Sequence, residues 1–361
     1  MARQAQHPSP RRLSALVLAL MSLVLATAAA AQTVTAEIKK DNGQDNVLAE
    51  FRHQAEGGDS DAMLTLGQYY LGGLPLEGKP VEANPDEALH WLHRAAKNNN
   101  AQAACTLASY YRGLKDAVST LDWTQRAASG GAPACMYALG MRMLSGAGAK
   151  NRQQAFEWIK KAADAGFLPA QFQLGHLYLN GAGTPHDGDK AAAAFQSLAR
   201  RGVPAAMYYT CAMTGSVNKQ AARDWCLKAA AAGNRMAMYQ LGTIYLSGDG
   251  VPRDEAQARQ WYIRAAALGE PDSMFWLGVM DEGGVGGPRN STEAARWVIK
   301  ALRGQSLQVD AMLRQPQGWS PAFWEALQTQ LQQAGVYAGP IDGRFTKATL
   351  QAIVAVIKQS A

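Results

Sequence analysis

The chain has 361 residues, of which 48% are hydrophobic and 18% are charged, and it carries four cysteines. This length is enough for several structural units, and an apolar fraction rich in alanine suits closely packed helices. The formal net charge of +6 is small for such a chain and gives little support for a nucleic-acid partner.

The first 31 residues have the layout of a secretory signal peptide. Arg11 and Arg12 precede an apolar run from Leu13 to Leu25, and the run leads into an alanine-rich exit that ends at Ala31. We expect cleavage after Ala31, with Ala30 as the alternative position. We expect export to the periplasm, with secretion from the cell as the alternative. The run is shorter than the about 20 residues that a membrane-spanning helix needs, so we expect no membrane span in the mature chain.

Removal of this segment takes away three arginines and leaves a net charge of +3. A nearly neutral, exported protein is not expected to bind nucleic acid.

The polar residues 32–45 are interpreted as a flexible leader. In residues 46–58, Ala49, Phe51 and Ala55 predict a helix without a partner, which we interpret as a half-repeat that caps the following array.

Residues 236–269 set the pattern for most of the chain. Ala237, Leu241 and Tyr245 recur every four residues and therefore share one face of a helix, with Gly242 beside them. A glycine inside a helix costs about 1 kcal/mol relative to alanine. Its presence there indicates that another backbone approaches the helix closely.

A second helix follows the glycine-rich turn at residues 247–252. Asp254, with Gln257 three residues later, predicts its N-cap, and Gly269 occupies the position of a left-handed C-terminal cap. The unit is therefore a two-helix hairpin. One hairpin cannot bury the rings of Trp261 and Tyr245 by itself, so neighbouring units must cover them.

The same two signals recur seven times within residues 59–304. A Leu-Gly pair, or a weaker form of it, marks each first helix: Leu66-Gly67, Leu107-Ala108, Leu139-Gly140, Leu174-Gly175, Thr210-Cys211, Leu241-Gly242 and Leu277-Gly278. An aromatic residue marks each second helix at intervals of 30 to 37 residues: Trp91, Trp123, Trp158, Phe195, Trp225, Trp261 and Trp297. One ring per unit at a fixed position predicts core packing in a stacked array.

These residues resemble the Sel1-like repeat family, which is related to the tetratricopeptide repeats. Residues 234–269 meet almost the whole family pattern, and the resemblance covers residues 59–304. It implies an all-α fold, namely an α-solenoid of about seven hairpins that serves as a protein-interaction scaffold without catalysis of its own. Residues 74–84 are an insertion in repeat one that we expect to project from the solenoid.

The repeat pattern stops after Gly304. Residues 305–320 combine proline, glycine and polar residues and predict a linker. Two helices within residues 321–361 then flank a loop that contains Pro340-Ile341-Asp342-Gly343. This unit of about 40 residues is small enough to depend on the solenoid for its stability.

Residues 321–361 resemble the peptidoglycan-binding domain family, a three-helix module. The match lies in Leu327-Gln328, Leu331, Gly335, Tyr337, Gly339, Pro340-Ile341-Asp342-Gly343, Phe345, Thr349 and Ala352-Ile353. The resemblance implies a small helical C-terminal domain that binds the cell wall, and we expect Ile341, Phe345 and Ile353 in its core.

Tyr337, Asp342 and Arg344 are the candidate peptidoglycan-binding residues. An aromatic face and two opposite charges on one exposed loop would suit a glycan or a stem peptide. The alternative is that Asp342 only caps its own turn.

The four cysteines allow two pairings in an oxidising compartment. Cys211 lies on the first helix of repeat five and Cys226 on the second helix of the same repeat, so they are a candidate disulfide. Cys105 and Cys135 lie on the first helices of adjacent repeats and form the second candidate pair. Buried thiols remain the alternative for both pairs, and neither spacing fits a zinc site.

Catalytic and metal-binding patterns are weak in this sequence. His90 and His93 flank Trp91, but no cysteine or carboxylate completes a metal site, so we interpret them as solvent-facing. The loop at residues 248–254 lacks the ligand spacing of a calcium loop and the lysine of a phosphate-binding loop. We therefore expect no metal, no cofactor and no enzymatic activity.

The leading hypothesis is an exported scaffold that binds an unidentified envelope protein through its solenoid and is tethered to peptidoglycan by its C-terminal domain. A secreted factor that acts on host proteins is one alternative. A peptidoglycan-modifying enzyme, or an accessory subunit of one, is another, although no catalytic constellation in the sequence supports it.

Overall fold

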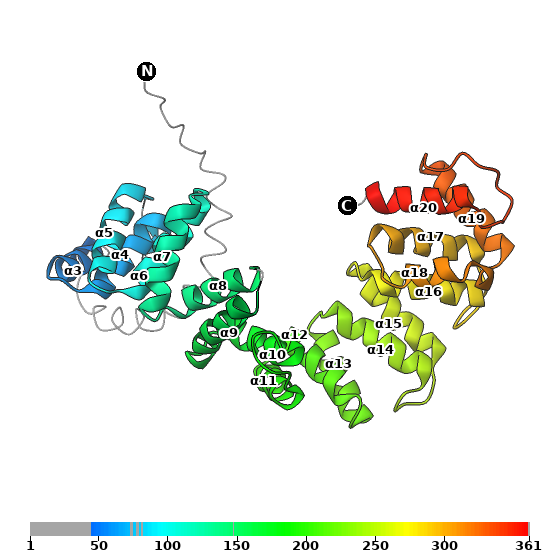
Figure 1. The fold of residues 1–361 in the computed structure, drawn as a ribbon, viewed down its shortest axis with the longest axis horizontal. Helices are drawn as coiled ribbons and strands as arrows, with labels where there is room; N and C mark the ends of the chain where they lie inside the picture. Colours follow the sequence, from blue (N-terminus) through cyan, green and yellow to red (C-terminus); the bar gives the residue numbers. More distant parts are fainter. Residues whose placement is uncertain (1–44, 73–74, 77–78, 81, 147, 360–361) are drawn as a thin grey trace, which may run out of the picture. The chain divides into compact units, whose positions relative to one another are not determined.

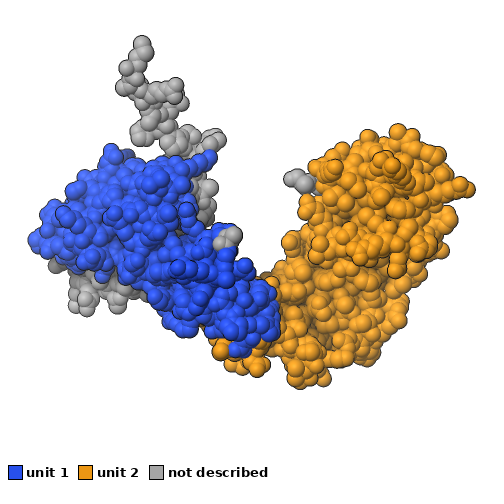
Figure 2. Space-filling model, viewed as in Figure 1, with its two compact units in different colours: residues 1–187 blue, residues 188–361 orange. Residues whose placement is uncertain are grey.

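The computed structural model describes residues 45–72, 75–76, 79–80, 82–146 and 148–359. Nearly all of these residues lie in helices or in the turns between them (Figure 1), and the predicted all-α fold class is confirmed. The chain divides into two compact units, residues 1–187 and 188–361 (Figure 2). The predicted signal peptide and residues 32–44 of the predicted leader lie outside the described residues.

Unit 1 begins with helix α3 (Asp45–Glu56), which buries Val47, Phe51 and Ala55 against the first repeat. Three helix pairs follow, and α10 (Leu168–Asn180) is the last helix of the unit. The pairs are α4 (Ser60–Gly72) with α5 (Pro85–Lys97), α6 (Ala101–Gly113) with α7 (Ala117–Ser129), and α8 (Pro133–Leu144) with α9 (Ala149–Asp164). The insertion of repeat one contains a short antiparallel pairing of β1 (Pro75–Leu76) with β2 (Lys79–Pro80).

Unit 2 begins with α11 (Gly188–Arg200) and continues with three helix pairs. These are α12 (Pro204–Thr214) with α13 (Lys219–Ala231), α14 (Arg235–Ser247) with α15 (Glu255–Ala267), and α16 (Pro271–Gly283) with α17 (Ser291–Arg303). The unit ends with α18 (Val309–Arg314), the 3-10 turn η2 (Pro316–Gly318), α19 (Pro321–Gln333) and α20 (Lys347–Gln359). No helix in the described part of the chain is both long enough and apolar enough to cross a bilayer.

The loop inside the hairpin varies in length, yet six repeats close it with the same backbone hydrogen bond. In each of these repeats, the backbone N–H of the residue that caps the second helix donates to a carbonyl on the first helix, at 2.8–3.0 Å. That carbonyl belongs to the residue four positions after the Leu of the Leu-Gly pair, or its equivalent. The pairs are Asn84 to Tyr70, Asp116 to Tyr111, Asp187 to Tyr178, Asn218 to Thr214, Asp254 to Tyr245, and Asn290 to Asp281. This bond fixes the start of the second helix whatever lies between, which explains how the insertion of repeat one is tolerated.

The predicted N-cap is confirmed, since Asp254 Oδ1 accepts a hydrogen bond from the N–H of Gln257 at 2.8 Å.

The turn after the second helix is the same in all seven repeats. One residue there has a φ between +59° and +99°: Asn99, Gly131, Gly166, Gly202, Gly233, Gly269 and Gln305. The next N–H donates back to the carbonyl five residues earlier, at 2.9–3.2 Å, as in a Schellman cap.

The glycine of the Leu-Gly pair lies against the second helix of its own hairpin. A β-carbon at Gly242 would stand 2.5 Å from Cε1 of Tyr262, and one at Gly140 would stand 2.6 Å from Cγ1 of Ile159. The predicted close approach exists, but its nearest atoms belong to a side chain and not to another backbone. Only glycine leaves room for these side chains to reach the first helix.

The predicted core position of the aromatic series is confirmed only in part: Trp91 is 5% exposed, whereas most of the other tryptophans only pack against the core. Trp158, Trp225, Trp261 and Trp297 are only half-buried, and the residue that follows each of them is buried. The position after the Trp is held by Leu92, Ile159, Cys226, Tyr262 and Val298, each with 0% exposure. Helical geometry explains this, because adjacent residues on a helix point about 100° apart and only one of them faces the first helix.

Phe195 belongs to this buried position and not to the Trp position. The positive-φ residue of each repeat comes eight positions after the Trp, whereas Gly202 comes seven positions after Phe195. Ala194 therefore occupies the Trp position in repeat four. Phe195 is fully buried, like Tyr262 at the equivalent place in repeat six.

Each tryptophan of the series is covered by a basic residue three positions later. The cationic group lies 4.1–5.0 Å from the ring centroid in the pairs Trp91 with Arg94, Trp123 with Arg126, Trp158 with Lys161, Trp225 with Lys228, Trp261 with Arg264, and Trp297 with Lys300. Repeat four has Ala194 and Ser197 at the same positions and thus lacks both partners. A basic side chain of the same helix therefore covers the outer face of each indole ring.

The C-terminal region shares one core with repeat seven. Phe275 of α16, Val298 of α17, Phe323 of α19 and Val356 of α20 belong to the same buried cluster. The predicted linker is part of that core, because Val309 and Met312 of α18 are 3% and 2% exposed. Residues 305–320 are therefore a structured connection, which corrects the prediction.

Candidate functional site

The loop at residues 337–344 presents only part of the predicted binding surface. Tyr337 is 5% exposed and its hydroxyl donates to the carbonyl of Pro340 at 2.8 Å. The ring is packed so closely that a β-carbon at Gly339 would stand 2.6 Å from the Tyr337 hydroxyl. The prediction that Tyr337 offers an aromatic face to a glycan is therefore corrected, since the ring builds the loop from inside.

Asp342 is used by its own turn, as the alternative reading had it. Its Oδ1 accepts from the N–H of Arg344 at 3.0 Å and from Nε2 of Gln328 at 3.1 Å. These hydrogen bonds hold the pKa of Asp342 below its usual value. Both Asp342 and Arg344 are exposed, but only the Arg344 side chain is outside the hydrogen bonds that build the turn.

Gln328 organises this loop, a role that the sequence analysis did not assign. It is fully buried, and its Oε1 accepts from the N–H groups of Asp342 at 3.0 Å and Gly343 at 3.1 Å. Its Nε2 donates to the carbonyl of Arg344 at 2.9 Å. One amide thus satisfies three backbone groups.

The predicted core residues of the C-terminal region are confirmed only in part. Ile353 is fully buried and Phe345 is half-buried, but Ile341 is 44% exposed and lies outside the core.

The structure joins Cys211 and Cys226, with an S–S distance of 2.05 Å and a Cα–Cα distance of 5.3 Å. Cys211 of α12 occupies the glycine position and Cys226 of α13 the buried position after the tryptophan. They are therefore the same position pair as Gly242 and Tyr262 in repeat six. The bond links the two helices of one hairpin.

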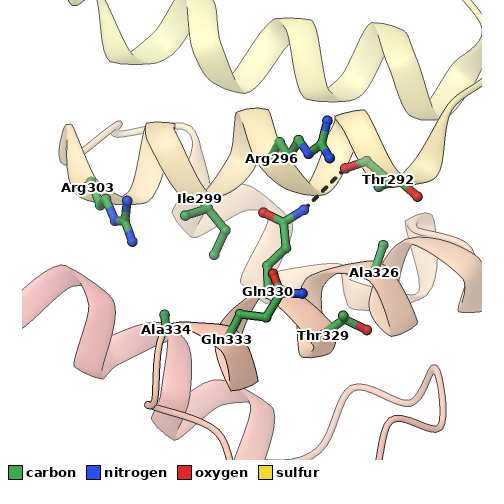
Figure 3. A pocket seen from close by; sticks show the side chains of 9 residues that line it. All are labelled: Thr292, Arg296, Ile299, Arg303, Ala326, Thr329, Gln330, Gln333 and Ala334. Atoms are coloured by element: carbon green, nitrogen blue, oxygen red, sulfur yellow. Dashed lines mark hydrogen bonds between the residues drawn. The ribbon is translucent and has the colours of Figure 1, made fainter.

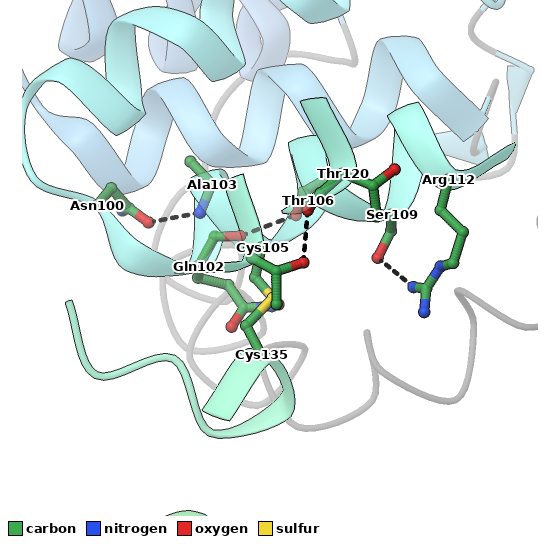
Figure 4. Close-up of a disulfide and its surroundings, with 10 residues drawn as sticks. Asn100, Gln102, Ala103, Cys105, Thr106, Ser109, Arg112, Thr120 and Cys135 are labelled. Atoms are coloured by element: carbon green, nitrogen blue, oxygen red, sulfur yellow. Dashed lines mark hydrogen bonds between the residues drawn. A yellow bond between two sulfur atoms is a disulfide. The ribbon is translucent and has the colours of Figure 1, made fainter. Parts of the chain in front are cut away.

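A second disulfide joins Cys105 of α6 to Cys135 of α8 (Figure 4), with a Cα–Cα distance of 5.8 Å. These are the first helices of adjacent repeats, so this bond links two hairpins. Both sulfurs are buried, and no free cysteine remains in the described chain.

The two histidines have different environments. His90 is exposed, as predicted, whereas His93 is half-buried, which corrects the prediction. The His93 ring lies 5.2 Å from that of Trp123, and its Nε2 lies 3.5 Å from the hydroxyl of Tyr111. Burial lowers the pKa of His93. No group of three or more potential metal ligands occurs among the residues that the structure describes.

A buried acidic pair was missed in the sequence. Asp281 and Glu282 are 2% and 8% exposed and stand where repeat six has Tyr245 and Leu246. Asp281 pairs with Arg259 of the preceding repeat, and Glu282 pairs with Arg289 and accepts from Ser291 at 2.7 Å. The sequence signal that could have revealed this pair is Asp281, which replaces the tyrosine that repeat six has at the same position. The Asp281 pair joins repeat seven to repeat six, whereas the Glu282 contacts link the two helices of repeat seven through its own loop.

A row of half-buried aromatic residues on the first helices was also missed. Two positions before the Leu of the Leu-Gly pair, or its equivalent, stand Tyr137, Phe172, Tyr208 and Tyr239, in repeats three to six. We call these four residues the first-helix aromatic row. Burial raises the pKa of Tyr137, Tyr208 and Tyr239. Within unit 2, Tyr208 and Tyr239 border the same core cluster, so their rings form one surface across successive repeats.

The comparison with protein families decides the identity of the array. The Sel1 repeat family matches residues 60–100, 101–131, 133–167, 168–203, 204–234, 235–270 and 271–306. The chain is a Sel1-repeat protein. Proteins of this family generally mediate protein–protein interactions, and their solenoids are typically scaffolds without catalytic activity.

Solved structures of other Sel1-repeat proteins resemble this Sel1-repeat protein. A Sel1 repeat protein from Oxalobacter formigenes is 26% identical, with a TM-score of 0.52 over 87% of this chain and 98% of that chain. The protein c5321, a protective antigen of uropathogenic Escherichia coli strains, is 23% identical, with a TM-score of 0.53 over 87% of this chain and 71% of that chain. A comparison with proteins of curated function gave no match.

Proposed function

We propose that this Sel1-repeat protein is an exported, non-catalytic scaffold that binds an envelope protein through the first helices of its repeats. The observation that carries the proposal is the first-helix aromatic row. Half-buried rings at one register position offer large contact areas at little entropic cost, because they are already held by the core behind them. Tryptophans of the second helices are less available, since basic side chains cover their faces.

Photo-crosslinking in intact cells tests this surface. A photoreactive phenylalanine analogue in place of Tyr239 should trap a partner, because Tyr239 is half-buried on a first helix. Ile263 is the matched control, since it is 44% exposed on the second helix α15. Crosslinks from Ile263 alone would assign the partner to the opposite helix and contradict the proposal.

The proposal includes export by the N-terminal segment and retention at peptidoglycan by the C-terminal region. The signal-like pattern of residues 1–31 and the resemblance of residues 321–361 to wall-binding modules support these two points. Detection of the mature chain in the periplasmic fraction tests export. Recovery mainly from the culture medium would favour the secreted alternative instead.

Sedimentation with purified sacculi tests the tether. Because α19 and α20 cover apolar residues of α17, removal of the tail would expose the core, and point variants of the full chain are preferable. Arg344→Gln should reduce retention, with Lys347→Gln as a control that removes a neighbouring exposed charge. Equal retention of both variants and wild type would exclude Arg344 from the contact, and no retention of wild type would reject the tether.

A further inference from the structure

A groove of about 460 Å³ lies between α17 of the last repeat and α19 of the C-terminal region. Figure 3 shows its nine lining side chains, which come only from these two helices. They are Thr292, Arg296, Ile299 and Arg303 from α17, and Ala326, Thr329, Gln330, Gln333 and Ala334 from α19 and its end. The volume is in the range of ligand-binding sites in proteins.

The groove follows from the register of its two helices. On α17 the lining residues are spaced by four, three and four positions, and on α19 residue 326 is followed by the adjacent pairs 329–330 and 333–334 at helical intervals, so each helix contributes one continuous stripe. Nε2 of Gln330 donates to the carbonyl of Thr292 at 3.3 Å and ties the stripes together at one end. The 6% exposed Ile299 forms an apolar floor midway along α17.

The charge of the groove has one sign. Arg296 and Arg303 flank Ile299 along α17, and none of the nine lining residues is acidic. Arg296 donates to Glu293 at 2.9 Å, but both side chains are substantially exposed, at 61% and 34%. Such a surface pair contributes little and is readily exchanged for another carboxylate. Arg303 is exposed and has no ion pair within the described residues.

The spacing of the two arginines defines the shape of a matching ligand. They are seven residues apart on one helix, which corresponds to about 10.5 Å along its axis at 1.5 Å per residue. In a polyproline II segment, residues three apart lie on the same face and about 9.3 Å apart. Two carboxylates at positions i and i+3 of an extended peptide therefore match the spacing of the two arginine positions along α17, while amide and hydroxyl side chains of α19 can bond the peptide backbone.

We propose that the groove between α17 and α19 is a docking site for an acidic, extended segment of a protein partner, with Arg296 and Arg303 each binding one carboxylate. This inference rests on the proposed function, since it presupposes a protein partner, but it assigns a site separate from the first-helix aromatic row. Charge complementarity and the polar lining select this occupant over an amphipathic helix, which would need a broad apolar groove.

Fluorescence anisotropy with the full chain tests the site. The probe is a labelled synthetic peptide whose core is Glu-Ala-Pro-Glu, and the reference is the same peptide with Gln-Ala-Pro-Gln. The double variant Arg296→Gln, Arg303→Gln should bind the acidic probe about tenfold more weakly, since two charge-assisted contacts are lost. The control double variant Lys347→Gln, Lys358→Gln removes two exposed charges from α20 and should retain the wild-type affinity.

A charge exchange makes the test independent of folding. Arg303→Glu should lose the acidic probe and regain binding to one of the two peptides in which a single glutamate is replaced by lysine. Equal weakening by the Arg and Lys double variants, or equal affinity for the acidic and the Gln peptides, would overturn the proposal. Arginine-dependent binding of soluble stem-peptide fragments of peptidoglycan, with no binding of the probe, would also overturn it and assign the groove to the wall.

The two proposals can fail separately. Loss of probe binding in the Arg296 and Arg303 variant with unchanged crosslinking from Tyr239 would support both sites. Absence of probe binding to wild type with crosslinking from Tyr239 intact would reject the groove and leave the first-helix surface standing.

Discussion

Repeats five and six are neighbours with the same register, but they join their two helices in different ways. In repeat six Gly242 makes room for the fully buried ring of Tyr262. In repeat five the same two positions hold Cys211 and Cys226, which are covalently linked. These two hairpins thus use either one large side chain against a glycine or a covalent bond between two smaller ones.

Repeats one, three and seven follow the glycine form, whereas repeat two departs from both forms, with Ala108 and Thr124 at the two positions. Gly67 faces Leu92, Gly140 faces Ile159 and Gly278 faces Val298. In each case the missing β-carbon on the first helix is matched by a branched or aromatic side chain on the second. Since packing in a protein interior is dense, a change on one side of the pair must be matched on the other.

The largest expected effect comes from filling the space at Gly242. The β-carbon of Gly242→Val would overlap the ring of Tyr262, so the variant should lower the free energy of unfolding by about 3 kcal/mol, the upper part of the range for overpacking. Urea unfolding followed by circular dichroism measures it. Ser247→Val, at an exposed position of the same helix, is the control, and a similar loss for both variants would contradict the role of packing against Tyr262, since valine is a better helix former than glycine.

A loss of similar size is expected when the disulfide of repeat five is removed. The bond closes a loop of 15 residues, and Cys211→Ala with Cys226→Ala should cost about 3 kcal/mol. Cys211→Gly with Cys226→Leu copies Gly67 and Leu92 of repeat one and should recover part of that loss. The comparison of the two repeats would be wrong if the alanine pair were as stable as the oxidised wild type.

An effect of about 1 kcal/mol is expected at the uniform turn that follows each second helix. Gln305 has a φ of +59°, a conformation that costs L-residues roughly 1–2 kcal/mol and glycine little. Gln305→Gly should therefore raise the thermal midpoint. Asn99→Gly should raise it less, because asparagine tolerates this conformation better. A lower midpoint for Gln305→Gly would show that its side chain makes a stabilising contact.

The smallest effect concerns the contact between repeats one and two. The pKa of His93 is lowered by burial, so the unfolded chain binds a proton at a higher pH than the folded chain does. Stability from neutral His93 is present above the ordinary histidine pKa of about 6.5 and is lost as the pH falls through the lower folded value. His93→Gln should flatten the pH profile of stability between pH 7 and about 5 relative to His90→Gln, and equal profiles would contradict this.

The sequence was sufficient where a single turn of backbone decides the structure. The N-cap at Asp254 and the positive φ at Gly269 follow from local hydrogen bonds that a few residues make with one another. The candidate wall-binding loop was less predictable. Gln328 holds that loop from a helix 14 residues away from Asp342, and the burial of Tyr337 depends on the same arrangement, so neither could be assigned from the loop itself.

The amino-acid pattern by itself determined the number of repeats and the turns that separate their helices, because these depend on spacing along the chain. Only the tertiary structure decided that Tyr262 and not Trp261 fills the interior, that residues 305–320 are part of a core, and that Arg296 and Arg303 border a groove. The reason is that burial and charge environment are set by which helices meet, and a sequence pattern fixes the face of a helix only to within about one residue.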